Sequence, residues 1–130
     1  MSIRIVRLGT RKRLAEGIRF GTVRRPPRGV AKEKYAAENW FDVWLPNLAP
    51  SAGLIRSTRG VEDPSRWPRF VARYRSEMAR SENSRLLDAF AALSHHANFS
   101  VGCYCEDERR CHRSVLREIL KEHGAKIALK

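Results

Sequence analysis

The sequence predicts an α/β fold: a single small domain of three-layer type, with a mostly parallel sheet and flanking helices. Short, half-alternating apolar segments at 2–8 and 18–23 are typical of strands. Near the C-terminus, a β-like run at 98–104, a helical pattern at 110–123 and a last apolar run at 126–129 follow one another. We interpret this series as a βαβ unit, whose strands are parallel and whose crossover is right-handed.

Length and composition agree with one globular domain over residues 1–130. A chain of 130 residues is close to the commonest domain size and has little spare length for a second core. Hydrophobic residues make up 42% of the chain and charged residues 31%, which excludes a largely disordered protein.

The chain is strongly basic. Lys and Arg number 26 against 14 acidic residues, a formal net charge of +12. Such a field attracts phosphate-bearing partners and acidic surfaces. A basic composition that serves only solubility explains the charge equally well, so charge alone does not select a function.

The lack of a targeting signal and the clustered cysteines predict a cytoplasmic protein. The N-terminus lacks a signal-peptide pattern, and no apolar run approaches the roughly 18 residues of a membrane helix. Three cysteines fall within residues 103–111, an odd and clustered set that suits a reducing compartment better than a disulfide framework. We expect no contact with a membrane.

The middle of the chain predicts a stiff loop followed by aromatic and helical segments. Residues 24–29 hold two prolines and three arginines, which exclude a helix. A short helix is expected at 31–39 and an extended, aromatic-rich core segment at 40–45. Residues 48–51 then turn toward another short element.

Two amphipathic helices are expected next. The first begins near Asp63-Pro64, and its apolar face consists of Trp67, Phe70, Val71, Tyr74 and Met78. The second runs from about 84 to 94, with four inward-facing residues: Leu86, Leu87, Phe90 and Leu93. Gly124 is the expected stop of the last helix.

The candidate site lies in residues 101–113, which leave a strand, cross a polar loop and enter a helix. Ligands of α/β proteins gather at this edge, where a helix N-terminus offers free N–H groups and a partial positive charge. The helix start and its cationic neighbours favour a thiolate at Cys111. The candidate catalytic residues are Cys105, Cys111 and His112.

The sequence resembles the YeaO-like family, domain of unknown function family 488. The resemblance rests on Cys103-Tyr-Cys-Glu with Cys111-His112-Arg113, on Arg24 with Pro27-Arg28-Gly29 and Lys32, and on Trp44-Leu45-Pro46 with Leu48-Ala49-Pro50-Ser51. It spans nearly the whole chain, with Val23 in place of a usual Asp and Pro26 in place of a usual Trp. The resemblance implies a compact α/β fold and supplies no activity.

We call the arginine-rich segment at 24–29 the arginine loop. If this loop meets the start of the helix at 110–123 at one edge of the sheet, the cationic groups of both segments converge on one anion. Planar guanidinium groups suit phosphate. The candidate anion-binding residues are Arg24, Arg28, Gly29, Lys32 and Arg113. Alternatively, Arg28 and Arg113 pair with the acidic residues of the loop, which are Glu106, Asp107 and Glu108.

Metal binding is not expected, and neither is a cofactor. Cys103, Cys105, Cys111 and His112 are zinc-ligand types, but their spacing differs from a zinc ribbon. Adjacent helical residues such as Cys111 and His112 diverge by about 100°, so a catalytic base for Cys111 is expected from elsewhere. Cys103 is expected to be a small core residue, and His112 a packed histidine satisfied by a backbone carbonyl.

Together these observations predict a binding or enzymatic domain for a phosphate-containing ligand, a nucleotide or nucleic acid. Two alternatives come from other classes. One is a non-catalytic basic module that binds nucleic acid with a steep salt dependence. The other is a structural zinc domain that unfolds on chelation.

Overall fold

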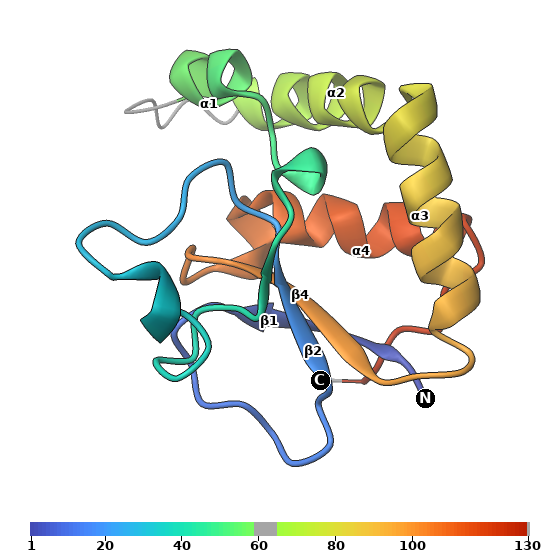
Figure 1. The fold of residues 1–130 in the computed structure, drawn as a ribbon. Helices are drawn as coiled ribbons and strands as arrows, with labels where there is room; N and C mark the ends of the chain where they lie inside the picture. The colour runs from blue at the N-terminus through green and yellow to red at the C-terminus, as the bar shows by residue number, and fades with distance from the viewer. Residues whose placement is uncertain (59–64, 130) are drawn as a thin grey trace.

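The computed structural model describes residues 1–58 and 65–129 (Figure 1). The strands are β1 (Ile3–Arg7), β2 (Ile18–Gly21), β3 (Val43–Trp44) and β4 (Phe99–Cys103). The helices are α1 (Ala52–Thr58), α2 (Arg66–Met78), α3 (Ser81–Leu93) and α4 (His112–Glu122). Short 3₁₀ turns occupy Lys32–Lys34, Pro46–Leu48 and Glu108–Arg110.

The strands form one parallel sheet in the order β1-β4-β2-β3. Val101 in the central strand β4 is in register with Ile5 on one side and Phe20 on the other. The α/β class and the parallel sheet predicted from the sequence are confirmed. Because the strands are parallel, all their carboxyl ends lie at one edge.

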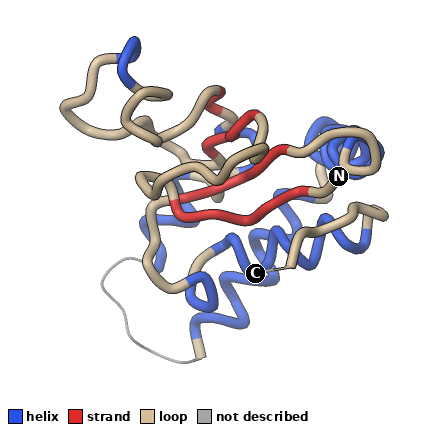
Figure 2. The backbone as a smooth tube through the Cα atoms, turned by 90° about the horizontal axis from the view of Figure 1, so that it is seen from below, coloured by secondary structure: helices blue, strands red, loops and turns tan. Residues whose placement is uncertain are grey.

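One face of the sheet carries the main apolar core, and the helices pack on that face (Figures 1 and 2). The strands contribute alternate residues to this core, for example Phe99 and Val101 of β4, as expected for the period of two along a strand. The helices contribute their buried stripes, which comprise Leu54 of α1, Phe70, Tyr74 and Met78 of α2, Leu87 and Phe90 of α3, and Val115, Leu116, Ile119 and Leu120 of α4.

The opposite face is covered by loops, which form the third layer. Gly21 and Gly102 are register partners there, and the missing side chains let the loops approach the backbone closely. A Cβ on Gly21 would lie 2.2 Å from the Phe41 ring, and one on Gly102 would lie 2.8 Å from Leu8. Phe41 and Leu8 belong to a second apolar cluster, together with Val23, Cys103 and Cys111.

A buried ion pair lies in the same loop-covered layer. Arg19 is only 1% exposed and donates hydrogen bonds from Nε and Nη2 to the carboxylate of Glu16. Its Nη1 donates to the carbonyl oxygens of Thr10 and Asn39, both at 2.8 Å. Ser100 of β4 donates a further hydrogen bond to Glu16. Every nitrogen of the Arg19 guanidinium group therefore has a partner.

The two predicted amphipathic helices are present, with some corrections. Phe70, Tyr74 and Met78 are buried in α2 as expected, whereas Asp63-Pro64 lies outside the described residues. Helix α3 begins at 81, three residues earlier than predicted. The prediction that Leu93 faces inward is wrong: it is 45% exposed, because the buried stripe of α3 ends on Phe90 and Ala91.

The C-terminal βαβ unit is present in reduced form. After α4, Gly124 adopts φ +93°, as expected for a helix stop. The predicted last strand is a single parallel bridge between Ile127 and Ile3. Hydrogen bonds from Ile3 N to the Lys126 carbonyl and from Ala128 N to the Ile3 carbonyl hold it beside β1. The predicted helix at 31–39 is likewise short, a 3₁₀ turn followed by hydrogen-bonded turns.

Candidate functional site

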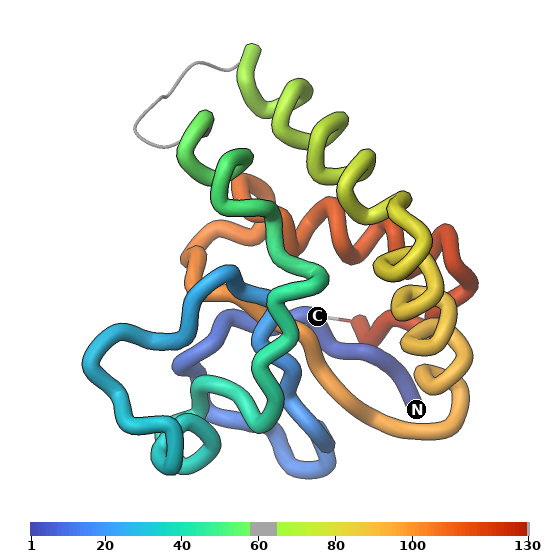
Figure 3. Tube along the Cα trace, turned by 45° about the horizontal axis from the view of Figure 1, so that its top comes forward, coloured from blue at the N-terminus to red at the C-terminus, as the bar shows by residue number. Residues whose placement is uncertain are grey.

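The strand-loop-helix segment lies at the carboxyl edge of the sheet. Cys103 ends the central strand, Thr22 directly follows β2, and Cys111 is the N-cap residue of α4. The loop between Cys103 and Cys111 runs beside the arginine loop (Figure 3). The Tyr104 hydroxyl there donates a hydrogen bond to the Arg25 carbonyl at 2.9 Å. The arginine loop and the cysteine loop therefore do meet.

Three thiols gather at this edge, and we call Cys103, Cys105 and Cys111 the thiol cluster. The sulfurs of Cys103 and Cys111 are 2.6 Å apart and both residues are buried. The Cys105 side chain is exposed. All three cysteines are free. The burial of Cys103 confirms its predicted place in the core.

His112 is buried and held in one orientation. Its Nε2 lies 2.8 Å from the carbonyl oxygen of Thr22, so Nε2 carries the proton and donates it. Burial lowers the pKa of His112 to about 4, and the ring is therefore neutral at physiological pH. The other ring nitrogen, Nδ1, lies 3.6 Å from the sulfur of Cys111. The predicted backbone partner of this histidine is confirmed.

The expected divergence of Cys111 and His112 is wrong. Two neighbours diverge by about 100° only when both are helical. Cys111 has the extended backbone angles φ −125° and ψ 151° of a residue outside the helix, whereas His112 begins it. The change of backbone at this boundary turns the two side chains toward one another.

The thiolate is favoured at a different cysteine from the one predicted. A hydrogen bond with Cys103 lowers the pKa of Cys111, but the bond with Cys105 and burial outweigh it and raise that pKa to about 11. Hydrogen bonds from Cys103 and then Cys111 lower the pKa of Cys105 far below its usual value, and the charge of Arg113 adds to this effect. Exposure to solvent also makes Cys105 the accessible thiol of the cluster.

In the arginine loop, Arg24 makes backbone contacts and the other candidate residues are exposed. Arg24 donates hydrogen bonds to three backbone carbonyls, those of Pro46, Ala49 and Pro50, and so braces the turn before α1. Arg28, Gly29 and Lys32 are exposed. Within residues 1–58 and 65–129, no partner makes a hydrogen bond or ion pair with the side chains of Arg28 and Lys32.

Arg113 is the candidate that the fold singles out. It lies in the first turn of α4, is only 3% exposed, and donates from Nη2 to the carbonyl of Cys105. Its Nε is buried and has no hydrogen-bond acceptor among the residues that the structure describes. A buried donor without a partner is costly, so this atom is a natural contact for a ligand.

The acidic residues of the loop pair with arginines other than those expected. Glu108 forms two hydrogen bonds with Arg117 of α4, at 2.7 and 2.9 Å. Glu106 lies 3.5 Å from Arg7 at the end of β1, and this pair is largely exposed. The alternative in which Glu106 or Glu108 occupies Arg113 is therefore not the arrangement observed.

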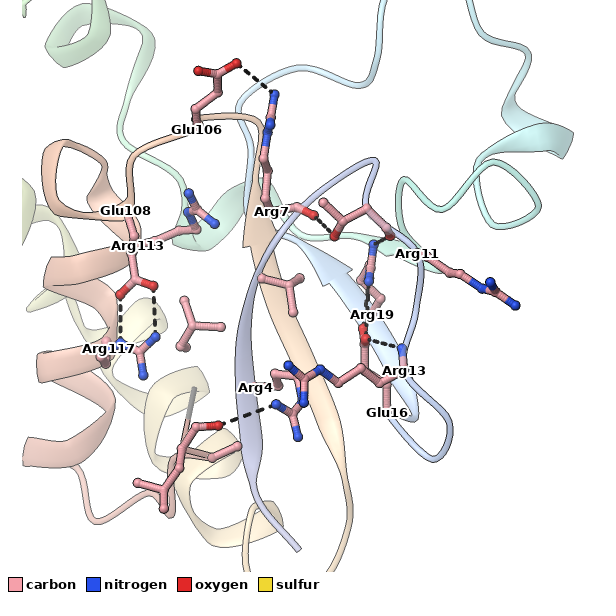
Figure 4. A pocket seen from close by; sticks show the side chains of 15 residues that line it. Arg4, Arg7, Arg11, Arg13, Glu16, Arg19, Glu106, Glu108, Arg113 and Arg117 are labelled. Carbon is pink, nitrogen blue, oxygen red and sulfur yellow. Dashed lines mark hydrogen bonds and ion pairs between the residues drawn. The ribbon is translucent and has the colours of Figure 1, made fainter.

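These residues line a cavity of about 450 Å³ along β1, which we call the arginine cavity (Figure 4). Seven arginines and three glutamates line it, an excess of four positive charges. The arginines are Arg4, Arg7, Arg11, Arg13, Arg19, Arg113 and Arg117. Figure 4 shows the guanidinium group of Arg113 turned toward the part of the cavity where Arg7 meets Glu106.

Sequence reasoning named Arg113, Glu106 and Glu108 but missed the rest of this cavity. Most of the missing residues come from β1 and the loop after it, and the others are Arg19 of β2, Arg117 of α4, Ala128 and Leu129. One usable signal was present: Arg7 ends the first strand and therefore lies at the same carboxyl edge as the thiol cluster.

Comparison with protein families identifies the family of the chain. The profile of a family described as the active DUF488-N3 subclade matches residues 3–124. The chain belongs to the DUF488-N3 subclade. This confirms the resemblance to the YeaO-like, or DUF488, proteins that the cysteine and arginine motifs indicated.

The match of this DUF488-N3 chain covers the seven arginines of the arginine cavity and the thiol cluster. No curated protein and no solved structure matches the chain. In the part of the DUF488-N3 chain that the structure describes, every helix is too short or too polar to cross a membrane.

Proposed function

We propose that this protein binds a phosphate-containing ligand of nucleotide size in the arginine cavity, with Arg113 as the central anchor. The observation that carries the proposal is the Nε of Arg113, a buried guanidinium donor without an acceptor among the described residues, in a residue that lines a strongly positive cavity. Phosphate oxygens accept hydrogen bonds from guanidinium groups in pairs and carry the complementary charge.

The size and position of the cavity support a compact ligand. Small-molecule sites range from about 300 to 1,000 Å³, and this cavity falls within that range. The first turn of α4 adds the partial positive charge of a helix N-terminus beside Arg113. The cavity therefore combines a defined volume, a buried donor and a favourable field.

Arg7 offers the second contact. It now faces Glu106 at 3.5 Å, and the two side chains are 46% and 84% exposed. An ion pair this exposed contributes little stability, so a phosphate group displaces the carboxylate at small cost. Arg117 is less available, because its two hydrogen bonds to Glu108 are short and half-buried.

Titration calorimetry with inorganic pyrophosphate and with ATP tests the proposal. Hydrogen bonds to charged groups contribute about 1.5–3 kcal/mol, so Arg113→Gln and Arg7→Gln should each lower affinity about 10- to 100-fold. Arg73→Gln removes the same charge from the exposed side of α2, outside the cavity, and should change affinity less than about twofold.

Two outcomes would contradict phosphate binding in the arginine cavity. Equal losses in all three variants, with a steep salt dependence and tighter binding of a single-stranded oligonucleotide, would indicate the basic nucleic-acid module instead. Unchanged affinity in both Arg7→Gln and Arg113→Gln would remove the phosphate site altogether. Because Arg113 is buried, its variant needs a circular-dichroism spectrum like that of wild type, whereas Arg7 is exposed and gives an independent answer.

A substitution of opposite sign sharpens the experiment. Glu106→Gln removes the carboxylate that competes for Arg7, and pyrophosphate affinity should rise about two- to fivefold. Glu82→Gln, on α3 away from the cavity, changes the net charge identically and serves as the control. An equal rise in both variants would show that only the overall field has changed.

A further inference from the structure

Two of the three thiols and the histidine form a compact set of metal-ligand atoms. The sulfurs of Cys103 and Cys111 and the Nδ1 of His112 all lie within 4.8 Å of one another. The distance from Cys111 Sγ to His112 Nδ1 is 3.6 Å, close to the separation of two ligands around one tetrahedral ion. The spacing of these residues in the sequence argued against such a set, and the extended backbone of Cys111 removes that argument.

His112 is oriented as a metal-bound histidine is. Because Nε2 donates its proton to the Thr22 carbonyl, Nδ1 keeps a free lone pair that faces the sulfurs. Histidine ligands of zinc characteristically donate their other ring N–H to a carbonyl or carboxylate, which fixes the ring. Thr22 follows β2, so the arrangement ties the ends of β2 and β4 to the start of α4.

The surroundings suit a thiolate-bound ion. Cys103, Cys111 and His112 are 2%, 3% and 7% exposed, and the two thiols pack with Leu8 and Phe41 in an apolar cluster. The Nη2 of Arg113 donates to the Cys105 carbonyl, which places a positive charge beside the cluster. That charge offsets the negative charge that several thiolates retain around one divalent cation.

Cys105 is the candidate for the fourth donor. It is exposed and lies two residues after Cys103, in the loop that leads to Cys111. Its sulfur is not among the three ligand atoms that lie within 4.8 Å of one another, so metal binding would draw this exposed side chain inward. Two sulfurs on one Zn²⁺ lie about 3.8 Å apart, given Zn–S bonds of about 2.3 Å. Since Cys103 and Cys111 are 2.6 Å apart, binding separates them by roughly 1 Å.

We propose that Cys103, Cys111 and His112 bind a Zn²⁺ ion, with Cys105 as the fourth ligand at the exposed side. Each thiol that binds loses its proton to solvent, and His112 binds through the lone pair of Nδ1. A set of three sulfurs and one nitrogen is a common tetrahedral zinc site, and soft thiolate ligands exclude Mg²⁺ and Ca²⁺. The site is distinct from the arginine cavity, and binding of the metal does not require a phosphate ligand.

Metal content and affinity provide the first test. Protein purified under reducing conditions in phosphate-free buffer is loaded with Zn²⁺, freed of excess ion and analysed by elemental mass spectrometry. Wild type should hold about one zinc per chain. In competition with a chromophoric chelator, Cys103→Ser and His112→Gln should bind zinc at least about 100-fold more weakly, and Cys105→Ser about tenfold more weakly.

His96→Gln is the matched control, because His96 is exposed and lies outside the cluster; it should bind zinc like wild type. Buried variants that misfold are recognised by their circular-dichroism spectra. Cys105→Ser changes an exposed side chain and keeps the test decisive. With Co²⁺ in place of Zn²⁺, its sulfur-to-cobalt absorption band should lose about a third of the wild-type intensity.

Two results would contradict the proposed zinc site. One is that wild type binds zinc no more tightly than His112→Gln does. The other is that the Co²⁺ complex of wild type shows no sulfur-to-cobalt absorption band. A Cys103–Cys111 disulfide in reduced preparations, with only one titratable thiol, would assign the close sulfur pair to redox chemistry instead. None of these outcomes changes the expected pyrophosphate binding, so the two proposals fail separately.

Discussion

Two buried arginines, Arg19 in the loop-covered layer and Arg113 in the first turn of α4, differ in how completely their hydrogen-bond donors are satisfied. Arg19 and Arg113 are 1% and 3% exposed, respectively. Arg19 has a partner for every guanidinium nitrogen, including the carboxylate of Glu16. Arg113 has one carbonyl partner and a buried Nε without one among the described residues. Burial alone therefore does not distinguish these two arginines, whereas the number of satisfied donors does, and on this difference we base the proposed role of Arg113.

The largest effect is expected when Arg19 is replaced. Arg19→Met leaves the Glu16 carboxylate buried and unpaired, which should lower the free energy of unfolding by about 3–5 kcal/mol. Arg113→Met leaves no buried carboxylate behind and should lower it by much less. Urea denaturation of the two variants measures the difference. Equal losses would mean that Arg113 is as structural as Arg19.

The next effect is stabilisation by ligand. Pyrophosphate at 100 times its Kd should raise the free energy of unfolding of wild type by about 2.7 kcal/mol. Arg113→Gln should show little of this rise at the same ligand concentration, because its affinity is reduced. Thermal unfolding with and without pyrophosphate measures it. A full rise in Arg113→Gln would contradict a role for this residue in binding.

A smaller effect is expected from acidification. Burial alone raises the pKa of Glu16, but hydrogen bonds from Arg19 and then Ser100 outweigh it, so the pKa is lowered overall. Glu16 therefore stabilises the fold above its unfolded pKa of about 4.3, and this contribution is lost as pH falls further. The stability curves of wild type and Glu16→Gln should converge below about pH 4. Curves that stay parallel would show that Glu16 does not carry this dependence.

The smallest effect is expected in the arginine loop. Arg28 is exposed, so Arg28→Ala should change stability by less than about 0.5 kcal/mol and pyrophosphate affinity by less than about twofold. Calorimetry and urea denaturation of one preparation measure both. A tenfold loss of affinity would bring this loop into the site beside Arg113.

Local patterns carried much of the fold prediction. The alternation in β1 and β2, the apolar stripe of α2 and the strand-loop-helix order around α4 all follow from near neighbours in the sequence, and each is confirmed. Boundaries were less predictable. Helix α3 starts earlier than expected. The last strand is a single bridge to Ile3, because the extent of a strand depends on its pairing across the fold.

The site depended more on distant contacts. The strand-loop-helix placement of Cys103 and Cys111 was predictable from the sequence. The role of Arg24 was not, because its three carbonyl partners lie more than 20 residues away. Glu16, three residues before Arg19, was a local signal for the buried ion pair. The other partners of Arg19, the carbonyls of Thr10 and Asn39, and the surroundings of Arg113 are supplied by the fold. The side chains of Cys111 and His112 approach each other because helix α4 begins between these two residues, and the sequence placed the start of this helix earlier.

Gly21 and Gly102 have a consequence for the history of the family. A Cβ on Gly21 would collide with the Phe41 ring, whereas a Cβ on Gly102 would collide with Leu8, with the Val6 side chain and with the Val6 carbonyl oxygen. A relative with alanine at position 21 is therefore expected to carry a smaller residue at position 41, but no change at position 8 would remove the contact of position 102 with the Val6 backbone. Substitutions at positions 21 and 41 should be inherited together, whereas glycine at position 102 should be kept, and this difference among related sequences records how the loops came to rest on the sheet.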